Sequence, residues 1–157
     1  MRALALSLLA SLGTATGAPV EEPAPLRLAV IVHGDVPVDD LSLGELRKIF
    51  LGDRQFWIED LRVVVLVPPI GSGERAVLLE KVYEKTESQY RHYWIAKVFR
   101  EEASSAPKRA ASARAAGDLV RQIPGAISVA DAAKVPPGVK VLRVDGKSAA
   151  DEDYPLH

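Results

Sequence analysis

The chain has 157 residues, a formal net charge of −1 and a hydrophobic fraction of 48%, so it can bury the core of one globular domain and is not expected to be disordered. The near-neutral charge argues against a general nucleic-acid or membrane-surface binder, because such proteins usually carry a strong basic excess. Cysteine is absent, which excludes disulfides, a thiol nucleophile and a lipidated N-terminal cysteine.

The first residues have the features of a secretory signal peptide. In residues 1–18 a basic residue is followed by an apolar stretch and then by small residues, and the apolar stretch is shorter than the roughly 20 residues of a membrane span. Cleavage is expected after Ala18, with Ala15 as the alternative, and the product would be periplasmic or secreted. Residues 19–25, rich in proline and glutamate, are expected to form an extended leader ahead of a single domain, residues 26–157.

The domain begins with a predicted strand and a predicted helix. Residues 26–34 are nearly continuous in Leu, Val and Ile, which is typical of a strand that is covered on both faces. In residues 41–52 the apolar spacing becomes helical. Ser42 and Glu45 have the spacing of a capping box, and Gly52 is a suitable helix end.

A second strand and two more helices are predicted next. Residues 62–69 form an apolar run that ends in two prolines, which cannot donate to a strand ladder. A helix is expected to start at Ser72, and another at Thr86, because Thr86 and Gln89 again have capping-box spacing. The aromatic stripe of this last helix is interpreted as core packing and not as a ligand box.

The last third of the domain continues the alternation of strands and helices. Residues 103–112 have the composition of a loop. Ser112 is expected to cap a helix that ends at Pro124–Gly125. Two further strands are predicted at residues 126–133 and 139–144. The alternation predicts an α/β fold with βαβ connections.

The turn Gly71–Ser72–Gly73 is the main candidate for a ligand site. A helix start offers unpaired N–H groups and a partial positive charge, and glycines let an anion approach them closely. Arg75 would lie in the first helical turn, where a cation opposes the helix dipole unless an anion is bound, whereas Glu74 would repel an anion. The purely structural alternative, in which Ser72 caps the helix between two turn glycines, stays open.

The remaining chemistry-bearing residues are scattered. Lys108, Arg109 and Arg114 form a basic segment that could approach an anionic ligand, although a solvated surface is the simpler interpretation. The three histidines do not cluster in sequence, and the chain lacks a G-x-S-x-G elbow and a P-loop lysine. We therefore expect a protein that is not an enzyme and that has no cofactor and no metal site.

The order of the motifs resembles the substrate-binding proteins of phosphate ABC transporters, which are type II periplasmic binding proteins. The resemblance extends over residues 26–156. The matching segments, in chain order, are LSLGELRKIFLGDRQFW, GSGER, YRHYW, LVRQIPGAISV and VKVLRVDGK. It implies an α/β lobe of the type II periplasmic-binding-protein kind, with a mixed sheet flanked by helices. Pro68 and Ile70 stand where the family places an arginine and an aspartate of the phosphate site.

The resemblance also implies a function. We expect reversible binding of phosphate or a related small oxyanion, through Gly71, Ser72, Gly73 and Arg75, for ABC-type uptake or sensing. Receptors of this family close two lobes over the ligand and need roughly twice this length, so the chain is interpreted as a short single-lobe member.

Several partners and one rival function follow from this interpretation. The expected partners are the oxyanion, an ABC permease or another envelope protein, and a second copy in a homodimer, but no nucleic acid. The alternative is a protein-interaction module of the cell envelope whose ligand site has degraded, which Pro68 and Ile70 favour.

Overall fold

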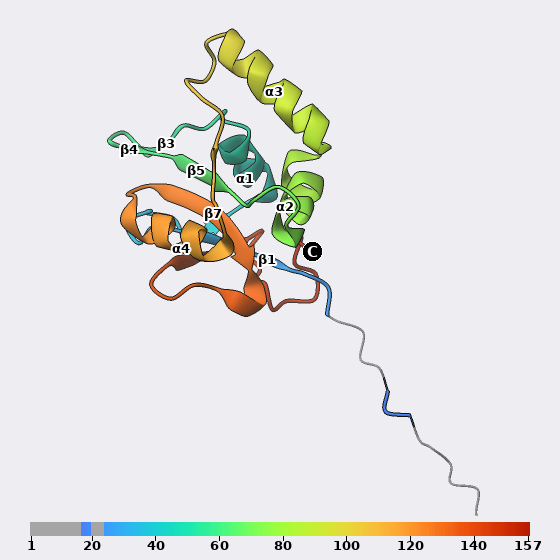
Figure 1. Ribbon diagram of the computed structural model, residues 1–157. Helices are drawn as coiled ribbons and strands as arrows, with labels where there is room; N and C mark the ends of the chain where they lie inside the picture. The colour runs from blue at the N-terminus through green and yellow to red at the C-terminus, as the bar shows by residue number, and fades with distance from the viewer. Residues whose placement is uncertain (1–16, 20–23) are drawn as a thin grey trace, which may run out of the picture.

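The computed structural model describes residues 17–19 and 24–157. Most of the expected signal peptide and of the leader therefore lies outside the described residues. The described domain is a layered α/β structure with one six-stranded mixed sheet and a separate two-stranded hairpin (Figure 1). This architecture confirms the predicted fold class. Among the described residues, no helix combines the length and the apolar character needed to cross a membrane.

The sheet contains both parallel and antiparallel neighbours. β1 pairs antiparallel with both β7 and β8, whereas β5 pairs parallel with both β6 and β7. The last edge pair, β2 and β8, is also parallel. In spatial order the strands are β2 (Asp40–Leu41), β8 (Lys140–Val144), β1 (Leu28–Val32), β7 (Ala126–Asp131), β5 (Val64–Val67) and β6 (Lys108–Arg109).

Helices cover both faces of this sheet. α4 lies against one face, while α1, α2 and the π-helical η1 pack against the other. The side chains of β1 alternate between the two faces: Val30 belongs to the larger core and Ile31 to the core beneath α4. All five residues of β1 are buried, as its apolar sequence predicts. The helices are α1 (Leu43–Phe50), α2 (Gly73–Leu78), η1 (Leu79–Tyr83), α3 (Glu87–Phe99), α4 (Ala113–Gln122) and the 3-10 helix η2 (Ala132–Lys134).

The capping signals placed the helix starts correctly. Ser42 and Glu45 form the predicted capping box at α1, and Thr86 and Gln89 form the one at α3. Ser112 caps α4 by accepting a hydrogen bond from the N–H of Ala115. Each cap satisfies N–H groups that would otherwise lack a partner in the first turn of the helix.

Several segments differ from the sequence-based expectation, among them the two-residue strand β2 and the π-helical η1, which were not predicted. A short hairpin, β3 (Phe56–Ile58) and β4 (Leu61–Arg62), was not predicted, because strands of three and two residues are too short to show a period. The predicted loop at residues 103–112 contains β6, which has only two residues. The strand predicted at residues 126–133 ends at Asp131, whose side chain caps η2.

Candidate functional site

Two parallel neighbouring strands, β5 and β6, each lead into a helix that begins at a serine. β5 is followed by Ser72 and α2, and β6 is followed by Ser112 and α4. The carboxyl ends of parallel strands meet at one edge of the sheet, so the two helix starts belong to the same edge. In open α/β sheets this edge is the usual place for a ligand, because helix N-termini and loops converge there.

The Gly71–Ser72–Gly73 turn is built tightly against the rest of the protein. Gly71 has φ +86°, a left-handed conformation that favours glycine. A Cβ on Gly73 would lie 3.1 Å from the Cδ2 atom of Leu26. Ser72 Oγ donates to the carbonyl of Pro69 at 2.8 Å and accepts from the N–H of Arg75 at 3.2 Å. Both glycines and the serine hydroxyl therefore have a structural role in this turn.

Two N–H groups remain at the start of α2. The first N–H groups of a helix have no intrahelical acceptor, and the Ser72 cap takes only that of Arg75. The N–H groups of Gly73 and Glu74 are left for water or for a ligand. Gly71 and Gly73 are exposed, while Ser72 and Glu74 are half-buried, so the turn presents these donors to solvent.

Arg75 is held inside the protein by another residue. Its guanidinium donates to both carboxylate oxygens of Glu87, from Nε at 2.9 Å and from Nη2 at 2.5 Å, and Nη1 donates to the carbonyl of Pro68 at 3.1 Å. The group also lies 4.9 Å from the ring centre of Tyr90, and Arg75 is only 4% exposed. A cation in the first turn of a helix is unfavourable unless an anion lies beside it. In this protein the carboxylate of Glu87 is that anion.

The charges around Glu87 show which cations lie near this edge. The hydrogen bonds from Arg75 lower the pKa of the Glu87 carboxyl, and the positive charges of Arg91 and Arg109 lower it as well. The pKa of Arg75 is raised, mainly by its hydrogen bonds to Glu87. Arg109 lines the same groove as Ile70 and Arg75, so its charge contributes positive potential near the α2 start.

The structure divides the basic segment predicted from the sequence. Successive side chains of a strand point to opposite faces, and Lys108 and Arg109 accordingly line different hollows. Arg109 shares a groove with Ile70 and Arg75. Arg114 is exposed in the first turn of α4. Among the described residues, neither Arg109 nor Arg114 forms an ion pair.

Lys108 faces a second, smaller hollow of about 170 Å³. Arg54, Arg62, Ser104 and Ser105 also line it, and none of its lining residues is acidic. Sequence reasoning missed this hollow because its lining comes from segments that are distant in sequence, chiefly residues 49–55, 62–65 and 103–108. The described residues contain no group of three or more His, Cys, Asp or Glu side chains that could hold a metal ion.

Comparisons with known proteins give a consistent structural result. No family model matches the chain. A solved structure of a putative phosphate ABC transporter substrate-binding protein with bound phosphate, from Clostridium perfringens, matches with a TM-score of 0.63 and 26% sequence identity. The match covers 79% of this chain and 47% of that protein.

Two further solved structures belong to the same group. An ABC-type phosphate transport receptor from Vibrio cholerae has a TM-score of 0.63 and 19% identity, over 79% of this chain and 48% of the receptor. PstS from Borrelia burgdorferi has a TM-score of 0.61 and 14% identity, over 78% of this chain and 49% of PstS. The structural neighbours are thus phosphate-type substrate-binding proteins, and the chain spans about half of their length.

Proposed function

We propose that the chain is an exported solute-binding protein that binds phosphate or a related small oxyanion, for ABC-type uptake or sensing. One observation carries this proposal: α2 and α4 start at the carboxyl ends of the neighbouring parallel strands β5 and β6. The similarity to a phosphate-bound structure supports the choice of ligand. The mechanism is reversible binding in which no bond is made or broken, so we propose no enzymatic activity.

The predicted ligand residues have different tasks in this site. The N–H groups of Gly73 and Glu74 bind the anion, and Gly71 shapes the turn that exposes them. Ser72 and Arg75 fix this turn from inside, because their side chains already bond to Pro69, Pro68 and Glu87. Arg75 is therefore a positioning residue for the oxyanion site.

The positive potential that attracts the anion comes from residues at the edge of the site. Arg109 and Arg114 are exposed and contribute long-range attraction, which salt weakens over a Debye length of about 8 Å at physiological ionic strength. The α2 dipole adds a partial positive charge. The described residues form a single lobe and span about half the length of the two-lobed neighbours, so we expect weak binding, with a dissociation constant of about 1 mM, which corresponds to about −4 kcal/mol.

A matched pair of substitutions at Gly73 tests the site. Proline is well tolerated at the first position of a helix, and Ser72 has the extended conformation (ψ 152°) that a following proline requires. Gly73→Pro removes the proposed N–H donor, whereas Gly73→Ala adds a similar Cβ beside Leu26 and keeps the donor. We expect Gly73→Pro to weaken phosphate binding several-fold relative to Gly73→Ala in a calorimetric titration.

Two results would overturn the proposal. The first is the absence of binding heat from the unsubstituted chain with phosphate and with sulfate up to about 10 mM. The second is equal phosphate affinity of the Gly73→Pro and Gly73→Ala variants, because a site built on this N–H group cannot be indifferent to its loss.

One observation favours a second candidate, a protein-interaction module of the cell envelope. The hydroxyl of Ser72 and the guanidinium of Arg75 are already bonded within the protein, and Pro68 and Ile70 bring no charge to the turn. A permease or other envelope protein that is captured equally by the Gly73→Pro and Gly73→Ala variants would support this candidate. Loss of the partner with Gly73→Pro alone would support coupling to the anion.

Export is a separate part of the proposal. Cleavage after Ala18 would leave a chain that begins at Pro19. N-terminal sequencing of the protein recovered from the periplasm or the medium checks this position, and cleavage after Ala15 is the alternative. Recovery of the intact N-terminus from the cytoplasm alone would contradict export.

A further inference from the structure

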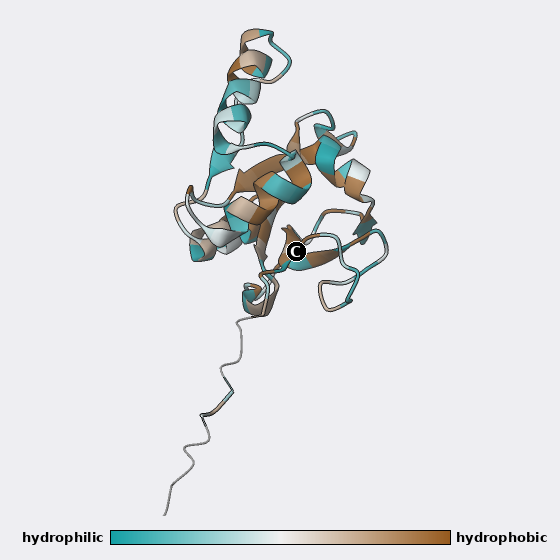
Figure 2. Cartoon of the chain, turned by 90° about the vertical axis from the view of Figure 1, so that its right-hand side faces the viewer, coloured by the Kyte–Doolittle hydropathy of each residue, from teal (hydrophilic) through white to brown (hydrophobic). Residues whose placement is uncertain are grey.

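Helix α3 projects from the body of the domain (Figures 1 and 2), and its C-terminal part carries exposed apolar side chains. Phe99 is 87% exposed and Ile95 is 62% exposed. Val98 lies between them in sequence and is also exposed, and Ile70 faces them from the turn before α2. Single exposed apolar residues are ordinary, but four of them around one hollow mark a surface that is normally covered.

These side chains border a groove of about 880 Å³ between α3 and the β5–α2 turn. The buried rings of Tyr90 and Trp94 also line it. Arg91 and Arg109 lie at the end of the groove near the start of α3. The other two charged residues of the groove, Arg75 and Glu87, neutralise each other in an ion pair. We call this surface the α3 groove.

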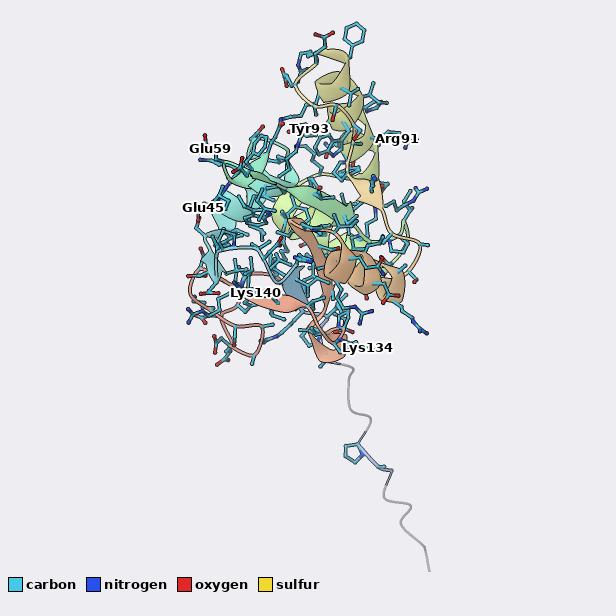
Figure 3. All side chains as sticks on the ribbon, turned by 90° about the vertical axis from the view of Figure 1, so that its left-hand side faces the viewer. Glu45, Glu59, Arg91, Tyr93, Lys134 and Lys140 are labelled. Carbon is cyan, nitrogen blue, oxygen red and sulfur yellow. The ribbon has the colours of Figure 1, made fainter. Side chains whose placement is uncertain are left out.

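The opposite end of α3 has the opposite charge. Arg100 caps the end of the helix, and the exposed Glu101 and Glu102 come next, so this segment carries one positive and two negative side chains. Figure 3 shows Arg91 on the outer side of α3, while Tyr93 points toward the body, where its hydroxyl donates to the carbonyl of Leu51. The outer surface therefore changes from basic at Arg91, through an apolar middle, to net acidic in residues 100–102, beyond the helix end.

We propose that the α3 groove binds α3 of a second copy of this chain, in an antiparallel arrangement about a two-fold axis. Residues 91, 95, 98 and 99 recur at helical spacing and share one face of α3. Antiparallel pairing centred between residues 96 and 97 places Ile95 opposite Val98 of the other copy. Residue 102 lies beyond the helix end, after Glu101 with its left-handed backbone (φ 60°), so the same pairing brings Arg91 near the segment Glu101–Glu102 of the other copy.

Three features select a second copy in this orientation. The pairing is self-complementary, so each contact occurs twice, as a two-fold interface requires. A parallel pairing would place arginine against arginine and glutamate against glutamate, which charge repulsion disfavours. Phe99, the most exposed apolar residue of the helix, enters the groove of the other copy beside Ile70, where the apolar lining gives it a binding surface.

Glu102 is free to take part in this interface. Among the described residues, its side chain bonds only to Arg100, at 2.7 Å from Nε and 3.2 Å from Nη2, and both side chains are about half exposed. An exposed ion pair of this kind is weak. The inference goes beyond oxyanion binding and does not depend on it. The proposed anion donors are the N–H groups of Gly73 and Glu74, and neither residue is part of the α3 pairing.

Sedimentation velocity of the purified chain, with and without phosphate, tests the oligomeric state. We expect a dimer in both conditions, and a monomer for Phe99→Ser. Ile58→Ser is the matched control, because Ile58 is 55% exposed on β3 and does not line the α3 groove, and this variant is expected to remain a dimer. The inference is overturned if the unsubstituted chain stays monomeric up to about 1 mM, or if Phe99→Ser dimerises as well as Ile58→Ser.

A charge exchange tests the antiparallel orientation. Arg91→Glu and Glu102→Arg should each raise the dimer dissociation constant about tenfold or more, and the double variant should recover most of the loss. A double variant as weak as the sum of the two single variants would overturn the antiparallel pairing. A monomeric chain that instead binds a different protein through Phe99 would overturn the second copy as the occupant.

Discussion

The two serine-capped helix starts at the edge of the sheet are built in opposite ways. At α2, the hydroxyl of Ser72 bonds to Pro69, and the nearby Arg75 is buried against Glu87. At α4, Ser112 and Arg114 are exposed, and Arg114 has no ion-pair partner among the described residues. The α2 start offers fixed backbone donors, whereas the α4 start offers charge.

If the proposed anion site is correct, this difference explains how it could work with Pro68 and Ile70 in place of charged residues before the turn. Backbone N–H groups can donate to an anion whatever side chain the residue carries, provided that the turn keeps its shape. The shape of the α2 turn depends on buried polar contacts that hold Pro68 and Pro69 in place. In the proposed function, the attraction of an anion to this edge would depend on the exposed Arg109 and Arg114, which form no ion pair among the described residues.

The largest expected difference is between the effects of replacing Arg75 of α2 and Arg114 of α4 on the free energy of unfolding. Arg75→Ala should lower the free energy of unfolding by about 2–4 kcal/mol, because it removes a buried guanidinium with three hydrogen bonds and leaves Glu87 without its partner. Arg114→Ala should change it by less than about 0.5 kcal/mol. Urea unfolding of both variants measures the contrast, and similar changes would contradict a structural role for Arg75.

The two capping serines should differ less. Ser72→Ala should lower the free energy of unfolding by about 1–2 kcal/mol, because the half-buried hydroxyl makes two hydrogen bonds. Ser112→Ala removes a single exposed cap bond and should lower it by about 0.5–1 kcal/mol. Thermal unfolding of the two variants side by side checks the order, and a larger loss at Ser112 would reverse our account of the two starts.

The pH dependence of stability should report the Arg75–Glu87 pair. Hydrogen bonds from Arg75 lower the pKa of Glu87 from its usual value of 4.5. The stabilisation is therefore complete above pH 4.5 and is lost as the pH falls through the lowered pKa. Glu87→Gln should be less stable near neutral pH and should lose less stability on acidification. Parallel unfolding curves for both proteins from neutral to acidic pH would contradict this coupling.

The smallest expected effect is on anion affinity. Arg109→Ala should weaken phosphate binding about two- to three-fold, the effect of a solvated charge worth about 0.5 kcal/mol, without changing stability. High salt should reduce the difference between Arg109→Ala and the unsubstituted chain. A phosphate titration at low and high ionic strength measures both, and Lys108→Ala is the control, because Lys108 lines the other hollow.

Local signals in the sequence were sufficient for most of the fold. The capping boxes at Ser42 and Thr86 placed two helix starts, because each box is formed by residues three positions apart. The buried strands β1 and β5 were recognisable from continuous apolar runs. The β3–β4 hairpin was missed, because its pairing is defined by contacts and not by a repeated pattern.

The site was predictable only in part. The turn at Ser72 and its role as a helix cap were evident from the residue types, and both are present in the structure. The partner of Arg75 was not evident, because Glu87 is twelve residues away and meets it only when α3 packs beside α2. The division between Lys108 and Arg109 also required the structure, since a strand of two residues shows no alternation.

The most direct test of the proposed site is a phosphate titration followed by the backbone amide signals of Gly73 and Glu74 in nuclear magnetic resonance spectra. Binding at the α2 start predicts that these two signals shift progressively and saturate in the millimolar range, more than the amide signals at the opposite edge of the sheet, such as that of Val144. Phosphate-dependent shifts elsewhere, with Gly73 and Glu74 unchanged, would contradict the account.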